Sequence, residues 1–269
     1  MITSKKIAKV LLMILIAIFM LVGCAGPAGP AGPAGTQGPA GPTGIGVTGA
    51  AINSAGHLVL TLSNGQTIDA GVASFAGVVP QVESSIVRID VNVSGGIDSG
   101  SGTIIDKRGY ITTNAHVVNG AQSINVTLMD GTVIPATVVV SNKTQDLAII
   151  KLTSTRTDFP VMPLGTMDDV LVGEAVMAMG FPGGNNLTGP ATFTSGIVSA
   201  IRSYTGVNYI QTDTQINPGN SGGCLFTLSG KMIGIPSYGI TPANQDFEGI
   251  NLAIPIDQVS IYIAANVKP

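Results

Sequence analysis

Apolar and polar positions alternate in short runs through most of the chain after residue 80, with turn residues between the runs. In one run Val87, Ile89, Val91 and Val93 are separated by single polar residues, which is typical of a strand with one buried face. A series of such runs predicts an all-β protein of the barrel or sandwich class. One amphipathic segment, 257–266, predicts a helix. The other predicted strands cover 102–106, 110–113, 123–129, 133–140, 147–152, 175–179, 192–203, 209–212, 224–228, 231–235 and 249–254.

A separate alternating segment occupies residues 46–71. Leucine stands at every second position from Leu58 to Leu62, and the dipeptide Asn64-Gly65 follows. This pattern predicts a β-hairpin with a type I′ turn. Such a small hairpin is not stable alone in water, and packing three copies together would bury its leucines. His57, at the start of the hairpin, is expected to cap or line it and to have no chemical role.

Glycine recurs at every third position from Gly26 to Gly44, and proline often follows it. Only glycine fits at the axis of a triple helix, so residues 24–45 are predicted to form a collagen-like stalk wound from three chains. A single-chain polyproline stalk is the alternative. The segment after the repeat resembles the short hairpin module that follows collagen-like repeats in bacterial surface proteins. Residues 46–78 are therefore interpreted as a spacer and a candidate trimerisation segment.

The first 23 residues combine lysines with an apolar run from Val10 to Val22. This run is too short to span a bilayer and is typical of a signal-peptide core. It ends in Leu-Val-Gly-Cys at Cys24, which resembles the bacterial lipobox, where the cysteine is acylated and becomes the mature N-terminus. We therefore predict a lipoprotein signal in 1–23 and an exported chain, lipid-anchored on the non-cytoplasmic side of an envelope membrane. The alternative is an ordinary secretory signal in which Cys24 is incidental.

Composition narrows the range of functions. Charged residues make up only 10% of the chain and the formal net charge is −3, so nothing neutralises phosphates and nucleic acid is not an expected partner. Hydrophobic residues at 45% are sufficient for a large core. If Cys24 carries lipid, Cys224 is the one remaining thiol and no intrachain disulfide can form. We expect no cofactor and no metal.

Three short motifs carry the candidate chemistry. His116 ends a Thr-Asn-Ala-His sequence after a predicted strand, Asp146 opens the apolar run 147–152, and Ser221 lies within Gly-Asn-Ser-Gly-Gly. Each motif alone is weak, since an Asn-Ser pair among glycines is usually a turn. Their order and context together resemble the trypsin-like serine proteases of the HtrA (Deg) family. The resemblance covers 79–269.

The resemblance implies a chymotrypsin-like fold of two six-stranded β-barrels with a short C-terminal helix and an active site between the barrels. In this interpretation Ser221 is the nucleophile, His116 is its general base, and Asp146 holds the imidazole and stabilises the imidazolium. The backbone N–H groups of Gly219 and Ser221 would form the oxyanion hole. The expected mechanism proceeds through an acyl-enzyme.

Substrate preference is less readable. The resemblance places a specificity pocket near four residues and leaves no acid there to receive Lys or Arg, so we expect cleavage after small aliphatic side chains. No PDZ domain is expected after the protease domain. The four tentative pocket residues are Thr214, Gln215, Ile216 and Ser237.

The sequence departs from its relatives at two positions. Asn220 stands where digestive proteases have an aspartate that pairs with a newly cut N-terminus, so activation by zymogen cleavage is not expected. The glycine-rich segment 181–186 is a candidate for ordering the oxyanion loop, and an inert surface loop is the alternative. Cys224 stands where the family commonly has proline. A buried thiol is expected there, with redox control as the alternative.

The predicted function is that of an exported, membrane-anchored serine endopeptidase that acts on unfolded or damaged exported proteins. The family resemblance and the glycine period both favour a homotrimer. Two alternatives stay open on the sequence alone. One is a catalytically silent adhesion or structural protein, and the other is a holdase that binds unfolded chains with little cleavage.

Overall fold

The computed structural model describes residues 41, 44–184, 187, 189–204, 206–237 and 249–268. The predicted signal segment, Cys24 and nearly all of the glycine repeat lie outside the described residues. Contacts divide the chain after Gly44, and every element below belongs to the unit that begins at Ile45. Within the described part, no helix is long and apolar enough to cross a membrane.

A small antiparallel sheet comes first in this unit. Its strand order is β1-β2-β3, so the predicted hairpin is formed by β2 and β3, while β1 adds a third strand that the sequence pattern did not indicate. The three strands are β1 (Val47–Ile52), β2 (His57–Leu62) and β3 (Thr67–Val72).

The turn between β2 and β3 differs from the expected type. A type I′ turn needs positive φ at both central residues. Gly65 has a φ of 82°, whereas Asn64 is not among the described residues with positive φ. The Gly65 N–H donates to the Leu62 carbonyl at 2.9 Å. The prediction of a type I′ turn is therefore wrong, and the loop is a longer one that needs a left-handed conformation only at its glycine.

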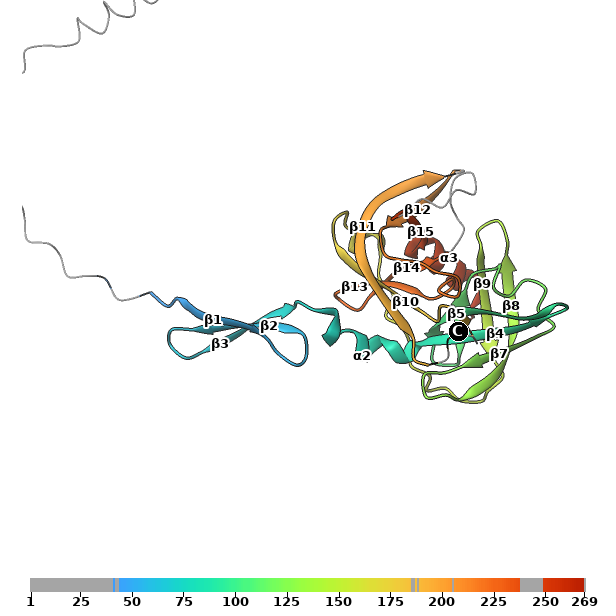
Figure 1. Ribbon diagram of the computed structural model, residues 1–269, viewed down its shortest axis with the longest axis horizontal. Helices are drawn as coiled ribbons and strands as arrows, with labels where there is room; N and C mark the ends of the chain where they lie inside the picture. Colours follow the sequence, from blue (N-terminus) through green and yellow to red (C-terminus); the bar gives the residue numbers. More distant parts are fainter. Residues whose placement is uncertain are drawn as a thin grey trace, which may run out of the picture. The chain divides into compact units, whose positions relative to one another are not determined.

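The remaining strands close into two six-stranded antiparallel barrels, which confirms the predicted fold (Figure 1). The first barrel has the order β4-β5-β6-β9-β8-β7 and the second β10-β11-β12-β15-β14-β13. Their strands are β4 (Ile86–Val93), β5 (Gly96–Asp106), β6 (Tyr110–Thr113), β7 (Ser123–Thr127), β8 (Val133–Asn142), β9 (Leu147–Leu152), β10 (Ala175–Gly180), β11 (Thr192–Tyr204), β12 (Val207–Thr212), β13 (Cys224–Thr227), β14 (Met232–Pro236) and β15 (Asn251–Pro255).

Helices are short and few among the described residues. The predicted C-terminal helix is α3 (Ile256–Asn266), which begins directly after Pro255 and buries Val259 and Tyr262. The sheet β1–β3 is joined to the first barrel by a chain of single turns. These short helices are η1 (Phe75–Gly77), α2 (Val79–Val82) and η2 (Glu83–Ser85), and η3 (Met167–Asp169) lies between the barrels in sequence.

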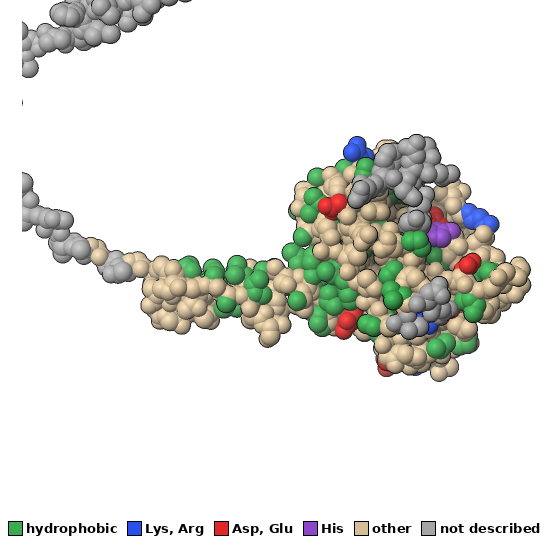
Figure 2. Space-filling view, viewed as in Figure 1, with side chains coloured by type: hydrophobic (Ala, Val, Ile, Leu, Met, Phe, Trp, Pro, Cys, Tyr) green, Lys and Arg blue, Asp and Glu red, His purple; other side chains and the backbone are tan. Residues whose placement is uncertain are grey.

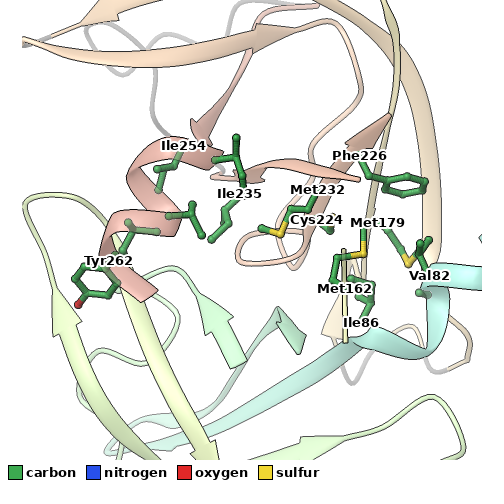
Figure 3. Packing of buried hydrophobic residues seen from close by; sticks show 14 of the residues in the cluster. Val82, Ile86, Met162, Met179, Cys224, Phe226, Met232, Ile235, Ile254 and Tyr262 are labelled. Atoms are coloured by element: carbon green, nitrogen blue, oxygen red, sulfur yellow. The ribbon is translucent and has the colours of Figure 1, made fainter. Parts of the chain in front are cut away.

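One hydrophobic cluster joins the two barrels (Figure 3). Ile86 and Leu147 come from strands of the first barrel, and Met179, Cys224 and Ile235 come from strands of the second. All of these side chains are at most 1% exposed. Because protein interiors pack at crystal-like density, a shared cluster of this kind fixes the two barrels against each other. The candidate site lies along this junction.

Candidate active site

The ends of two neighbouring strands bring His116 and Asp146 together. Strands β6 and β9 are antiparallel partners with Thr113 opposite Ala148. The loop that follows β6 carries His116, and Asp146 directly precedes β9, so both lie at the same edge of the first barrel. The Nδ1 atom of His116 is 2.9 Å from Oδ2 and 3.0 Å from Oδ1 of Asp146. The backbone N–H of His116 also donates to Oδ1 at 3.0 Å.

The Asp146 backbone is held in an unusual conformation. Asp146 is the one residue other than glycine with positive φ, 52°, in the part of the chain that the structure describes. Its carbonyl accepts hydrogen bonds from the Ala115 N–H at 3.1 Å and from Asn114 Nδ2 at 2.9 Å. Its carboxylate accepts a further bond at Oδ2 from Ser237 Oγ at 2.7 Å. Strained φ values persist where the surroundings hold them and cluster at functional sites.

These contacts determine the direction in which the pKa of the Asp146 carboxyl shifts. Burial alone would raise the pKa of the Asp146 carboxyl, but the hydrogen bond and attraction from His116 and the bond from Ser237 outweigh burial and hold the pKa below its ordinary value. A carboxylate can only accept, so Nδ1 of His116 must carry the proton in their bond. In the neutral imidazole with this tautomer, the other ring nitrogen, Nε2, carries a lone pair and can act as a base.

Ser221 lies just before β13, where contacts from both barrels reach it. The Ser221 carbonyl accepts from the Ser101 N–H at 2.9 Å, and the N–H of the next residue, Gly222, donates to the Pro236 carbonyl at 3.1 Å. A Cβ on Gly222 would overlap the Thr113 hydroxyl and the Ser101 carbonyl oxygen. The glycine after the serine therefore lets the Ser221 turn approach the loop that carries His116. Ser221 itself is 4% exposed.

The orientation of the Gly219 amide follows from its peptide partner. The Pro218 carbonyl accepts from the Gly183 N–H at 3.1 Å. The C=O and N–H of a trans peptide point in opposite directions, so the Gly219 N–H points away from Gly183. Gly219 has a φ of 100°, and a Cβ there would overlap the Phe181 carbonyl oxygen. Both facts require glycine at this position.

The Ser221 amide is oriented in the same way. The Asn220 carbonyl accepts from the Gly223 N–H at 3.1 Å, and the Asn220 N–H donates to the Asn217 carbonyl at 2.9 Å. The Ser221 N–H therefore points away from Gly223. Paired N–H groups on a tight glycine turn are the arrangement that binds a developing oxyanion.

The four tentative pocket residues are placed differently from one another. Thr214 is fully buried and its hydroxyl accepts from the Thr212 hydroxyl at 2.7 Å, whereas Gln215 is exposed and Ile216 is 4% exposed. Ser237 is 3% exposed and bonds to Asp146, so its hydroxyl orients the carboxylate. Sequence reasoning did not identify this role, because the only local signal was a polar residue at the end of β14.

Two further sequence predictions concern the neighbourhood of Ser221. Asn220 is 1% exposed, and its Oδ1 has no partner within the described residues. Of the segment 181–186, residues up to Gly184 are described, and a Cβ on Gly184 would overlap Ser99. No three His, Cys, Asp or Glu side chains are grouped to hold a metal in the described ranges.

Cys224 is expected to be chemically inert in the folded chain. It is 0% exposed, and burial raises the pKa of its thiol well above the ordinary value, which disfavours the reactive thiolate. Iodoacetamide at pH 8 should therefore leave Cys224 unmodified in the native chain and alkylate it fully in urea, as measured by intact mass. Rapid alkylation of the native chain would instead support redox control.

Comparison with known protein families and structures places this arrangement among proteases. Residues 100–235 match the model of the trypsin-like peptidase domain. A probable periplasmic serine endoprotease (DegP-like) of Hahella chejuensis is 47% identical over 163 residues, and the serine protease Do-like HtrA of Bacillus subtilis is 42% identical over 173 residues. These matches cover 59% and 60% of this chain but only 33% and 37% of the relatives. The chain thus spans about a third of the length of the curated relatives it matches.

Solved structures agree with this placement. The serine endoprotease from Yersinia pestis superposes with a TM-score of 0.63 at 33% identity, covering 72% of this chain and 67% of that one. An HtrA-type protease solved with a tripeptide gives a TM-score of 0.64 at 32% identity, covering 72% of this chain and 64% of that one. The double barrel described above is therefore the fold of HtrA proteases.

Proposed function

Because the chain belongs to the trypsin-like peptidase domain family, we propose that it is an exported serine endopeptidase of the HtrA type that works through Ser221, His116 and Asp146. The observation that carries the proposal is the His116–Asp146 pair, held at 2.9 Å beside the Ser221 turn at the junction of the barrels. Its proton arrangement is the one a general base needs.

In the proposed reaction, Ser221 Oγ attacks the carbonyl carbon of the scissile peptide bond while Nε2 of His116 takes the hydroxyl proton. The N–H groups of Gly219 and Ser221 stabilise the oxyanion of the tetrahedral intermediate. Collapse of the intermediate breaks the C–N bond, and His116 gives its proton to the leaving amine. Water, which gives a proton to His116, then attacks the acyl-enzyme carbonyl. Collapse of the second tetrahedral intermediate breaks its bond to Ser221 Oγ, which takes the proton back from His116, and the new carboxylate leaves.

The proposed setting is the cell envelope, with Cys24 as the site of the lipid anchor. Relatives described as periplasmic serine endoproteases support export. The proposed substrates are unfolded or damaged exported proteins, cleaved after small aliphatic residues. The proposed assembly is a homotrimer, which the glycine period at 26–44 favours because a collagen-like helix needs three chains.

One experiment tests the peptidase proposal directly. The chain from Ala25 onward is incubated with unfolded casein and, separately, with a fluorophosphonate probe, and the products are identified by mass spectrometry. We expect casein fragments that end in small aliphatic residues, together with probe attached at Ser221. Casein that stays intact and soluble, with no probe attached, would favour a holdase and overturn the proposal. Fragments that end mainly in Arg would contradict the proposed specificity.

The Gly219 amide can be tested by adding one methyl group. Gly219→Ala should lower kcat by about 10² to 10³, the usual cost of losing an oxyanion donor, because a Cβ overlaps the Phe181 carbonyl and turns the amide away. Gly131→Ala is the matched control, since Gly131 also has positive φ, 83°, but nothing lies within 4 Å of its added Cβ. Initial rates on a casein-derived peptide measure both variants, and equal rates would refute the assignment.

A further inference from the structure

The small sheet has one apolar face and one polar face. Side chains alternate between the two faces of a strand, so Leu58, Leu60 and Leu62 of β2 lie on one face. Ile52 is paired with Leu58, and Ala50 and Ile68 are both paired with Leu60, which places them on that face too. We call these residues the apolar face, and its members are Ala50, Ile52, Leu58, Leu60, Leu62 and Ile68.

The opposite face is polar. Val59 is paired there with Asp69, and Thr61 with Thr67. Asp69 Oδ2 is 2.7 Å from Nδ1 of His57. Both side chains of this hydrogen-bonded pair are partly exposed to water, so this face needs no protein partner.

Within the described residues no core cluster packs against the apolar face, whose three leucines are half-buried. Ile52 is 56% exposed and Ile68 is 48% exposed, and none of the six residues belongs to a core cluster of the described chain. Figure 2 shows hydrophobic side chains gathered in a row over this sheet. An isolated three-stranded sheet needs a hydrophobic layer for stability, so this face is a contact surface.

The preceding chain segment, residues 24–44, offers no large apolar side chain to pair with the apolar face. Residues 24–44 consist of glycine, proline, alanine, threonine, glutamine and Cys24, with no large apolar side chain. The glycine period of that segment instead predicts an assembly of three chains, because a collagen-like triple helix needs glycine at every third position. The last glycine of the period, Gly44, is only three residues before the start of β1 at Val47. If three chains wind as the glycine period predicts, three copies of the sheet would follow directly after the winding.

We propose that the apolar face packs against the same face of two further copies of this chain, so that β1–β3 forms a hydrophobic interface that holds the trimer together. This inference deepens the homotrimer proposed above, and it does not depend on the peptidase chemistry. Leu60 lies at the centre of the apolar face, between its strand partners Ala50 and Ile68. The proposal therefore makes Leu60 the main contact between the copies.

Two adjacent residues provide a matched test. Leu60→Asp places a charge on the apolar face, whereas Thr61→Asp places the same charge on the polar face. Mass is measured by sedimentation equilibrium on the chain from Ala25 onward, and cleavage of a short peptide is measured in the same samples. We expect three times the chain mass for the parent and for Thr61→Asp, and the single-chain mass for Leu60→Asp. A monomeric parent, or a trimeric Leu60→Asp, would overturn the proposal.

Cross-linking gives a second measurement that does not depend on a destabilising charge. In the chain from Ala25 the buried Cys224 is the sole cysteine, so a cysteine added at position 60 or 61 is the one accessible thiol. Leu60→Cys should form dimers linked by disulfide under mild oxidation, and Thr61→Cys should not. Equal cross-linking of both would exclude the proposed face. Binding of the parent to phosphatidylglycerol vesicles that Leu60→Asp abolishes would assign the face to a membrane instead.

Ser101 carries a second inference from a separate set of contacts. Its side chain is fully buried, and its hydroxyl donates to the Gly219 carbonyl at 2.6 Å and accepts from the Phe181 N–H at 2.8 Å. The glycines on either side have no room for a side chain, since a Cβ would lie 2.7 Å from Val117 on one side and 2.6 Å from Ile111 on the other. Strand β5 therefore presents this hydroxyl at a fixed position.

We infer that Ser101 is a positioning residue that holds Gly219 in the conformation whose N–H serves the oxyanion, an inference that rests on the proposed function. Glycine is the residue most free to change its backbone conformation, so the two peptides around Gly219 need external restraint. Gly183 restrains the peptide before it and Ser101 restrains the peptide after it. Without the hydroxyl, a buried carbonyl and a buried N–H both lose their partner, which favours a different loop conformation.

The test compares Ser101→Ala with Ser85→Ala, which removes an equally buried hydroxyl that donates to the Val82 carbonyl at 2.6 Å, outside the site. Ser101→Ala should lower kcat at least about tenfold, up to the roughly 10² of a lost oxyanion donor, with KM unchanged. Ser85→Ala should leave kcat unchanged. Equal kcat values in the parent and Ser101→Ala would overturn the inference.

A readout without catalysis separates this inference from the peptidase proposal. Amide hydrogen exchange in the peptide covering residues 217–223 should become faster in Ser101→Ala and stay the same in Ser85→Ala. If the parent does not cleave peptides but this difference is present, the proposed activity fails and the positioning role stands. Unchanged exchange in Ser101→Ala would overturn the positioning role whatever the activity.

Discussion

Replacing Ser221 with alanine is expected to lower kcat by about 10⁶, to the level that binding and the oxyanion hole supply without a nucleophile. The alanine keeps the backbone N–H that we propose stabilises the oxyanion, and it keeps the carbonyl that accepts from the Ser101 N–H, so the candidate site should stay assembled. It removes only the oxygen that forms the acyl-enzyme. The loss should therefore fall on kcat, with peptide binding retained.

Single-turnover and steady-state rates on a fluorogenic peptide measure this effect, and isothermal titration measures peptide binding. Ser229→Ala is the matched control, because Ser229 lies in the exposed turn after β13 and its hydroxyl contacts Thr227 at 2.7 Å. Residual activity of a few per cent in Ser221→Ala would show that another group is the nucleophile.

Asp146→Asn is expected to lower kcat by about 10⁴, the effect of holding the imidazole in the wrong tautomer. The parent carboxylate can only accept, which keeps the proton on Nδ1 of His116. An amide that turns its NH₂ group toward Nδ1 donates instead, so the proton moves to Nε2 and the base is lost. Asparagine tolerates positive φ at least as well as aspartate, so the backbone at this position should keep its conformation.

The measurement is the rate of fluorophosphonate labelling together with kcat, at pH 7 to 9. Asp130→Asn is the control, since Asp130 is exposed in the turn between β7 and β8 and accepts from the Thr132 N–H at 2.9 Å, without contact to His116. Labelling of Asp146→Asn at the parent rate would contradict the assigned role. A general loss of folding would be visible as a lower unfolding temperature, which Asp130→Asn should not show.

Local pattern was sufficient for much of the fold. The bounds of β6 and β9 were predicted to the residue, because polar or turn residues flank each strand: Gly109 and Asn114 flank β6, and Asp146 and Thr153 flank β9. Strand β5 begins at Gly96 and not at 102, since its first three residues are exposed and show no alternating apolar pattern, and their pairing with β4 is not visible in the local sequence. The type I′ turn was wrong because Asn-Gly also suits loops with one left-handed glycine.

The residues of the candidate site also divide into those with a local sequence signal and those without one. His116, Asp146 and Ser221 were predicted from motifs, since each lies in a recognisable local sequence. Ser237 and Ser101 have no such signal, because their partners are 91 and 118 residues away in the chain and meet them only when both barrels close. The anchor at Cys24 and the collagen-like stalk remain predictions, since they fall outside the described residues.

The cluster that joins the two barrels bears on self-digestion. A target segment must bind in the active site of an endopeptidase in extended form. A folded chain is therefore cut only where it opens locally. Here Ile86 and Leu147 of one barrel are buried against Met179 and Cys224 of the other, so freeing a core strand of either barrel disrupts both. Opening of that size costs close to the full free energy of unfolding. If the chain cleaves unfolded proteins as proposed, it should outlast them, and autolysis should be confined to its surface loops.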